Sequence, residues 1–236
     1  MQEWKRQEIK IKEFLAKQHQ KYGGMKLAEQ AVPSYMHWFP LMSYTFWRRI
    51  KKAVLAASSN RDIGNVLDFG AGTGISLPFL SRVSKSDKNC LWAFEPEDYA
   101  RQIIRELSSE FALTEVKVLE SFDEVKKIPP GSIDTILALD VLEHIEDLEA
   151  TVLALKKLVN KNSVIIVSSP TESWLYKLTR QLFGSEEYKQ HYHFSNAEHV
   201  EAVLAKFFDV KLIERMYPPF VYFRLVECRW PADLES

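Results

Sequence analysis

The sequence places a carboxylate and three glycines in a pattern that can bind a small ligand. Asp68 lies two residues before Gly70, and Gly72 and Gly74 complete the spacing D-x-G-x-G-x-G directly after the apolar run 65–69. Glycines let the backbone turn sharply and let a ligand approach without a side chain in the way. A helix that begins after them offers unpaired N–H donors. The carboxylate suits a cationic part of a ligand, such as the ammonium group of an amino acid.

Two other nucleotide-binding patterns do not fit this loop. A dinucleotide loop, G-x-G-x-x-G, needs a glycine where the sequence has Ile75, and no Gly-Lys-Ser/Thr of a P-loop follows. Glu95 ends the next apolar run, 21 residues after Gly74, and an acid there can accept both hydroxyls of a ribose. The alternative is a solvated glutamate at a helix start, because Pro96 begins the next helical pattern.

Two histidines lie where a base for proton removal is needed. His144 follows the fourth apolar run, and His193 comes just before a helix for which Ser195 and Glu198 form a capping box. The carboxyl edge of a parallel sheet is where ligands bind, so either imidazole can face an acceptor molecule. We take His193 as the first candidate for a catalytic residue and His144 as the second.

The same region has the composition of a divalent-metal site. Asp140, Glu143 and His144 have i, i+3, i+4 spacing and would share a face on one helical turn. Together with His193 they would supply oxygen and nitrogen ligands. A structural or acid–base role is the interpretation we favour over metal binding.

Short apolar runs alternate with helical patterns from residue 63 onward. In the pattern 148–159, apolar side chains such as Leu148, Val152 and Leu155 would form one buried stripe. Apolar strands separated by helices predict a parallel, doubly wound sheet that is covered on both faces. The predicted strands are 65–69, 90–94, 116–119, 135–139 and 164–167.

Both ends of the chain differ from this alternation. The runs 210–216 and 220–228 have no room for a helix between them, so they predict an antiparallel hairpin on one edge of the sheet. Residues 1–60 are expected to be an N-terminal helical extension, with a helix over 43–57, and residues 61–236 to be the ligand-binding domain. The aromatic and basic stretch 35–52 can cap the ligand pocket, grip an apolar acceptor or contact a membrane surface.

Residues 173–192 are interpreted as an insertion that is either a lid over the acceptor site or a helical excursion on the surface.

The composition indicates the class of protein and its location in the cell. The 31 Lys and Arg balance the 32 Asp and Glu, which gives no strong signal for nucleic acid. Cys90 and Cys228 are expected to be free thiols. No apolar run has the length of a membrane span, and no apolar signal segment is seen, so we expect a cytoplasmic protein.

These motifs, taken in order, resemble a known family. The segments 68–74 and 132–144, with Glu95 between them, are similar to the successive motifs of class I S-adenosylmethionine-dependent methyltransferases. The similarity is greatest to the broad group that includes the ubiquinone-biosynthesis O-methyltransferases, and it runs from about residue 63 onward. It implies a seven-stranded, mostly parallel α/β sheet that ends in an antiparallel hairpin.

The resemblance also implies roles for the candidate residues. Asp68 would lie near the methionine part of S-adenosylmethionine, Glu95 would hold the ribose, and the backbone of Asp140 would border the methionine moiety. Ser121 and Phe122 are assigned only as neighbours of the adenine, because Glu120 to Asp123 departs from the usual acid followed by a small residue. The loop residues that would line the cofactor are Gly70, Ala71, Gly72 and Gly74, with Pro96 beside Glu95.

The expected function is methyl transfer to a small-molecule acceptor, on oxygen, with S-adenosylhomocysteine as the product. The alternatives are methylation of RNA or protein and a non-catalytic cofactor-binding module. An NAD-dependent oxidoreductase is the alternative by fold, and Ile75 argues against it.

Overall fold

The computed structural model describes residues 2–22, 40–86, 89–113, 116–171, 194–216 and 223–231. Within these residues seven strands form one sheet in the order β3-β2-β1-β4-β5-β7-β6. The first five strands are parallel, and β7 lies antiparallel to both β5 and β6. The doubly wound sheet with a closing hairpin is therefore confirmed. The strands are β1 (Val66–Phe69), β2 (Leu91–Phe94), β3 (Val116–Leu119), β4 (Ile133–Leu139), β5 (Val159–Pro170), β6 (Asp209–Met216) and β7 (Phe223–Arg229).

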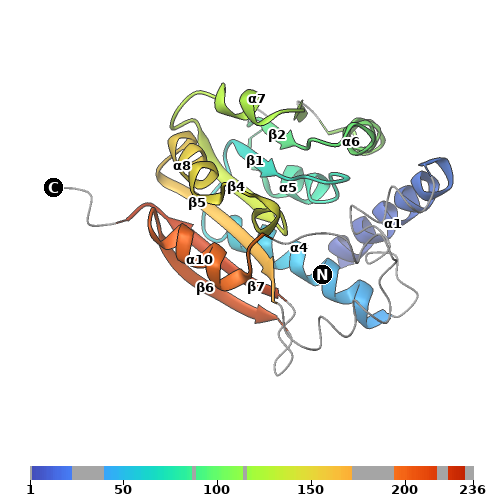
Figure 1. Ribbon diagram of the computed structural model, residues 1–236. Coiled ribbons are helices and arrows are strands. Elements are labelled where there is room, and N and C mark those ends of the chain that lie inside the picture. Colours follow the sequence, from blue (N-terminus) through green and yellow to red (C-terminus); the bar gives the residue numbers. More distant parts are fainter. Residues whose placement is uncertain are drawn as a thin grey trace.

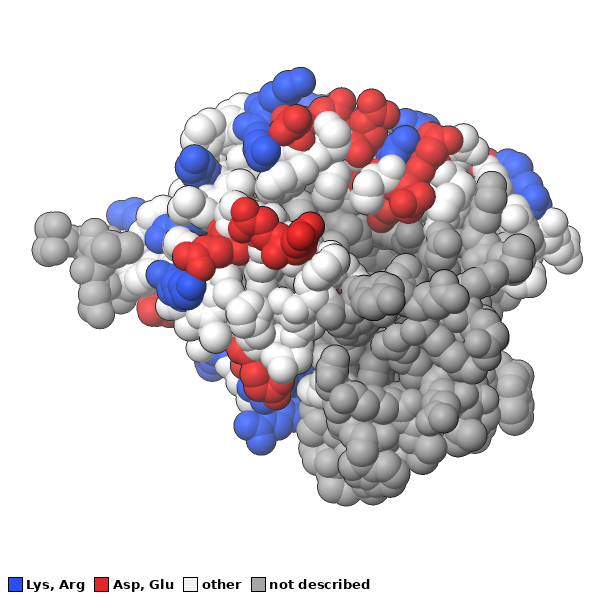
Figure 2. Space-filling view, in the orientation of Figure 1, with Lys and Arg blue, Asp and Glu red and all other residues white. Residues whose placement is uncertain are grey.

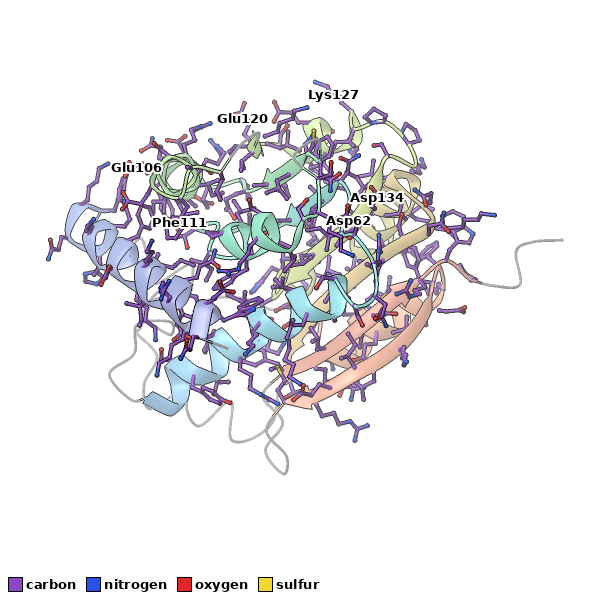
Figure 3. All side chains as sticks on the ribbon, turned by 180° about the vertical axis from the view of Figure 1, so that it is seen from behind. Asp62, Glu106, Phe111, Glu120, Lys127 and Asp134 are labelled. Carbon is purple, nitrogen blue, oxygen red and sulfur yellow. The ribbon has the colours of Figure 1, made fainter. Side chains whose placement is uncertain are left out.

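Helices cover both faces of the sheet, which explains why β1 is buried along its whole length. Val66 packs in one hydrophobic core, and Leu67 packs in a second core on the opposite face of the sheet. The helices of the first core are α1 (Gln2–Tyr22), α4 (Pro40–Ala57), α5 (Leu77–Val83) and α6 (Asp98–Glu110), and those of the second are α7 (Phe122–Lys126), α8 (Leu148–Leu158) and α10 (Ala197–Ala205). Figure 1 shows α8 and α10 in front of the sheet, and Figure 3 shows α1 and α4 in front when the molecule is seen from behind.

Two local predictions need correction. β5 begins at Val159, five residues before the predicted start. The first residues of the strand are polar and partly exposed, as at Lys161, so the apolar pattern begins later than the strand does. The N-cap of α10 is Asn196, whose side chain accepts a hydrogen bond from the His199 amide at 2.8 Å, so the predicted cap at Ser195 is one residue too early. An asparagine oxygen serves this position as well as a serine oxygen does. The buried stripe of α8 is confirmed at Leu148, Val152, Leu155 and Leu158.

The two N-terminal helices pack into the same core as the sheet. Ile11 and Leu15 of α1 and Ile50 of α4 are almost completely buried in the first core. Pro40 is the first residue of α4, a position that needs no backbone N–H. Phe46 and Trp47 are buried, so these aromatic side chains face the protein interior. Residues 23–39 lie outside the described residues, and a separate extension that ends at residue 60 remains a prediction.

Polar contacts hold α1 against α6. The carboxylate of Glu106 accepts hydrogen bonds from Lys21 at 2.5 Å, from Gln18 at 2.9 Å and from Tyr22 at 3.1 Å. Figure 3 shows Glu106 beside the end of α1. In the first turn of α1, the ring of Trp4 stacks on that of Phe79 of α5 with 4.5 Å between centroids. Among the described helices, none is both long and apolar enough to cross a membrane. Cys90 and Cys228 are both free.

Candidate functional site

The glycine loop joins the end of β1 to α5 and contains three glycines in the left-handed backbone conformation. Gly70, Gly72 and Gly74 have φ values of 76°, 56° and 75°, a region that side chains rarely adopt. A Cβ on Gly70 would lie 2.5 Å from the side chain of Val141, which follows β4. The first glycine is therefore required both by its conformation and by the close approach of the β4 end.

Asp68 is a buried carboxylate at the base of this loop. It lies on β1, and its Oδ2 accepts a hydrogen bond from the hydroxyl of Ser76. The pKa of Asp68 is raised to about 6, mainly by burial; the Ser76 hydrogen bond opposes the shift and the charge of Glu95 adds to it. A ligand ammonium group would favour the charged form of this carboxylate. Sequence reasoning missed Ser76, although its place two residues after Gly74, at the N-cap of α5, is a usable signal.

Glu95 reaches across to the glycine loop from the end of β2. Its Oε2 accepts the amide N–H of Gly72 at 2.8 Å, and its Oε1 accepts the amide N–H of Glu97 at 3.1 Å. Burial raises the pKa of Glu95, and these two backbone hydrogen bonds oppose the shift. Each carboxylate oxygen has a second lone-pair site, so Glu95 can still accept two hydroxyl groups.

The end of β3 adds an aromatic ring beside the loop. The ring of Phe122 lies 5.9 Å from that of Phe69 and 6.3 Å from that of Phe94, measured between centroids. Ser121 is the N-cap of α7 and accepts the Glu124 amide at 3.3 Å. Pro96 is exposed next to Glu95. The structure thus brings the candidate residues of β1, β2 and β3 to one edge of the sheet.

Asp140, at the end of β4, is held by three groups. Its backbone has φ 54°, its amide donates to the Ser168 carbonyl at 2.8 Å, and its Oδ1 accepts the Ser168 hydroxyl at 2.7 Å. Its other carboxylate oxygen forms an ion pair with Arg49 of α4. Sequence reasoning missed Arg49 and Ser168 because both contacts join residues that are far apart in the chain.

Glu143 and His144 lie in different environments. They belong to a short 3-10 helix, η1 (Leu142–His144), in which Glu143 is 1% exposed and His144 is exposed to solvent. The expected shared face is therefore not formed, because one of the two adjacent side chains is buried and the other is exposed. Burial raises the pKa of Glu143 to about 7, and its own backbone amide and the charge of Arg49 oppose this shift.

The predicted metal set is only partly described. His193 lies outside the described residues, as does the predicted lid at 173–192. Among the residues that are described, no group of three or more His, Cys, Asp or Glu side chains could hold a metal ion. The chain re-enters the described structure at Phe194 and Ser195, whose amides donate to the Glu143 carbonyl at 2.9 Å and 3.2 Å.

Exposed acids surround the edge where these residues meet. Figure 2 shows acidic side chains gathered near the top and near the middle of the described part of this face. In the sequence, several exposed acids follow β2, β3 and β4, which places them at the carboxyl edge of the sheet, where ligands bind in such folds. The exposed acids that follow these strands are Glu97, Asp98, Glu120, Asp123, Glu146 and Asp147.

The donor and acceptor groups at this edge fit S-adenosylmethionine. Asp68 and Glu95 offer two buried carboxylates for an ammonium group and for ribose hydroxyls, and Gly72 leaves the loop between them without a side chain. Residues 42–208 match the family described as "Methyltransferase domain". The chain belongs to this methyltransferase family. The match begins inside α4 and ends in the residues that follow α10.

Other proteins support the assignment to methyltransferases. The chain is 36% identical over 110 residues to proteins named "uncharacterized methyltransferase" from Bacillus cereus and Bacillus anthracis. The match covers 45% of this methyltransferase and 47% of theirs, so the chain spans about half the length of the curated relatives it matches.

Solved structures share the fold at low sequence identity. A SAM-dependent methyltransferase from Aquifex aeolicus superposes with a TM-score of 0.59 at 18% identity, over 77% of this chain and 89% of that one. The magnesium protoporphyrin IX methyltransferase of Synechocystis PCC 6803, solved with bound SAH, gives 0.60 at 16% identity, over 79% and 84%. The N-methyltransferase NodS of Bradyrhizobium japonicum, also solved with SAH, gives 0.57 at 15% identity, over 78% and 86%.

Proposed function

We propose that this methyltransferase transfers a methyl group from S-adenosylmethionine to a small-molecule acceptor, with oxygen as the methylated atom. The observation that carries the proposal is the buried pair Asp68 and Glu95 on either side of the glycine loop, with Glu95 hydrogen-bonded to the Gly72 amide at 2.8 Å. S-adenosylmethionine supplies an activated methyl group on a sulfonium centre. The protein therefore has to bind this cofactor, align the acceptor and accept a proton.

The residues at the carboxyl edge divide this work by chemistry. Glu95 would accept the ribose hydroxyls, and Asp68 would face the ammonium group, directly or through water. Gly70, Gly72 and Gly74, with Ala71, would allow the cofactor to approach the backbone, and the Asp140 backbone would border the methionine moiety. Ser121, Phe122 and Pro96 would lie near the nucleoside, where the ring of Phe122 supports this placement by its contact with Phe69 at 5.9 Å.

His193 and His144 remain our candidates at the acceptor end. The exposure of His144 supports access to an acceptor, and Phe194 and Ser195, which follow His193, are hydrogen-bonded to the Glu143 carbonyl next to His144. We infer that one imidazole accepts the proton that the acceptor hydroxyl loses. Once an acceptor is found, His193→Ala or His144→Ala should lower kcat strongly and leave the cofactor affinity unchanged. Loss of cofactor affinity in both variants would contradict this role.

Calorimetric titration tests the proposed cofactor directly. S-adenosylmethionine and S-adenosylhomocysteine should both bind the purified chain, and NAD should give no heat of binding. Gly72→Val provides the matched variant, because a branched side chain at φ 56° is strained and would lie beside the loop backbone. Binding of NAD without binding of either adenosyl compound would refute the proposal. A panel of hydroxyl-bearing acceptors with isotopically labelled cofactor would then identify the substrate.

A further inference from the structure

Arg49 is a buried cation that connects α4 to the turn after β4. The residue is 3% exposed, and its guanidinium forms an ion pair with the Asp140 carboxylate. The same guanidinium lies 5.3 Å from the ring centroid of Phe46 and 4.8 Å from that of Phe223. A charge in such surroundings is retained only when it is paired, because an isolated buried charge is very costly.

The Asp140 turn depends on this contact for its conformation. A non-glycine residue at φ 54° is in a sparsely populated region and persists only when its surroundings hold it there. Ser168 binds both the amide and the carboxylate of Asp140 from β5, and Arg49 binds the carboxylate from α4. Asp140 is thus fixed from two separate elements.

The next residue transmits this geometry to the glycine loop. Val141 follows Asp140 directly, and its side chain fills the space above Gly70 so closely that a Cβ there would lie 2.5 Å from it. A shift of the Asp140 turn would therefore move Val141 against the first glycine of the loop. The described contacts run without a gap from Arg49 through Asp140 and Val141 to Gly70.

The neighbouring arginine offers a comparison within the same helix. Arg48 also pairs with an acid, Glu214 on β6, and Lys52 binds the same carboxylate at 2.9 Å. That pair joins α4 to the outer strand of the sheet and has no described contact with the glycine loop. Substitution of Arg48 therefore affects the attachment of α4 to the sheet, whereas substitution of Arg49 affects the contact that leads to the glycine loop.

We propose that Arg49 is a positioning residue for cofactor binding, which holds the Asp140–Val141 turn against the glycine loop. On this inference α4 contributes to cofactor binding through Arg49. The inference rests on the proposed function, because it requires that the loop binds S-adenosylmethionine and its product.

The test compares S-adenosylhomocysteine affinity in Arg49→Met and Arg48→Met, with thermal unfolding measured alongside. Arg49→Met should weaken binding by about tenfold, and Arg48→Met should leave it within about twofold. Arg49→Lys, which keeps the charge but not the planar fork, should fall between the wild type and Arg49→Met. Because Arg49 and Asp140 act through one contact, Arg49→Met with Asp140→Asn should be no weaker than Arg49→Met alone.

Each outcome decides between the two claims. A wild-type chain that does not bind S-adenosylhomocysteine overturns the proposed function. Wild-type binding with equal affinity in Arg49→Met and Arg48→Met overturns the role of Arg49, whatever the change in Tm. If Arg49→Met does not fold, Arg49→Lys and the double variant, which removes both charges, carry the same comparison. An unchanged affinity in those two variants would also overturn the inference.

Discussion

At the residue scale, two buried carboxylates define the candidate cofactor site. Asp68 and Glu95 are both almost completely buried, and the charge of Glu95 contributes to the raised pKa of Asp68. Placing two acids together in the interior destabilises their charged forms unless donors or a cation offset the cost. The backbone amides of Gly72 and Glu97 donate hydrogen bonds that stabilise the charged form of Glu95. A bound ammonium group would stabilise the charged form of Asp68.

Glu95→Gln should weaken binding of S-adenosylmethionine while preserving the fold. The amide keeps the size of the side chain but replaces charge-assisted hydrogen bonds, which contribute about 1.5–3 kcal/mol each. Calorimetry on the variant gives the loss of affinity, and circular dichroism checks the fold. Glu97→Gln is the control, since that side chain is exposed two residues away. Equal affinities in the wild type and Glu95→Gln would place the ribose elsewhere.

Glu143→Gln should raise stability at high pH. Burial raises the pKa of Glu143 from 4.5 to about 7 in the folded protein. The folded state therefore holds the proton more tightly, and the free energy of unfolding falls as the pH rises from 4.5 through 7. Removing the charge should raise Tm at pH 8, by an amount equivalent to about 1–3 kcal/mol, and much less at pH 5. Glu146→Gln, an exposed neighbour, should show no such pH dependence. The same Tm difference for Glu143→Gln at both pH values would contradict the burial effect.

At the scale of helices and strands, local patterns predict most elements but not the contacts between them. Apolar runs identify β1 and β2 because strands covered on both faces carry apolar side chains throughout. The edge strand β3 is only partly buried, and its three apolar residues were sufficient to predict it. The same criterion misses the first residues of β5, since Lys161 and its neighbours are polar and exposed. The pairing of Arg49 with Asp140 has no local period, because it is set by how α4 crosses the sheet. The candidate cofactor loop was therefore predictable, and its support was not.

The packing of α1 leads to a prediction about the N-terminal segment. Leu15→Ala should destabilise the whole domain by about 2–5 kcal/mol, because the side chain is completely buried in the core that also holds β1 and α5. Ile9→Ala on the same helix should change stability by less than about 0.5 kcal/mol, since Ile9 is 49% exposed. Urea denaturation measures both values. If α1 were a detachable lid, Leu15→Ala would leave the main transition unchanged.

At the scale of the whole molecule, an almost neutral chain carries its acids unevenly. The 31 basic and 32 acidic residues nearly cancel, yet exposed acids follow β2, β3 and β4 at the edge that holds the candidate site. Asp98 and Glu120 form ion pairs with Arg101, and Asp123 forms one with Lys126. The other acids of the set would attract a cationic ligand at long range. S-adenosylmethionine carries a sulfonium charge that S-adenosylhomocysteine lacks, so the field acts differently on the donor and on the product.

The affinity for S-adenosylmethionine should fall more steeply with added salt than the affinity for S-adenosylhomocysteine. Salt screens exposed charges over about 10 Å at 0.1 M, which removes the attraction of the acidic edge for the extra charge. Parallel calorimetric titrations of the two compounds from low to high salt measure the two slopes, and the product acts as the matched control ligand. Parallel slopes would show that the exposed acids do not contribute to binding.

The position of β7 has a consequence for the order in which the chain folds during synthesis. β6 is made before β7, but in the described sheet β6 pairs with β7 and not with β5. Until residues 223–229 have left the ribosome, β5 presents an open edge over residues 165–170, which are buried in the finished protein. Open apolar edges are templates for pairing with other chains. The growing polypeptide thus keeps an apolar strand edge unpaired until its last strand completes the sheet.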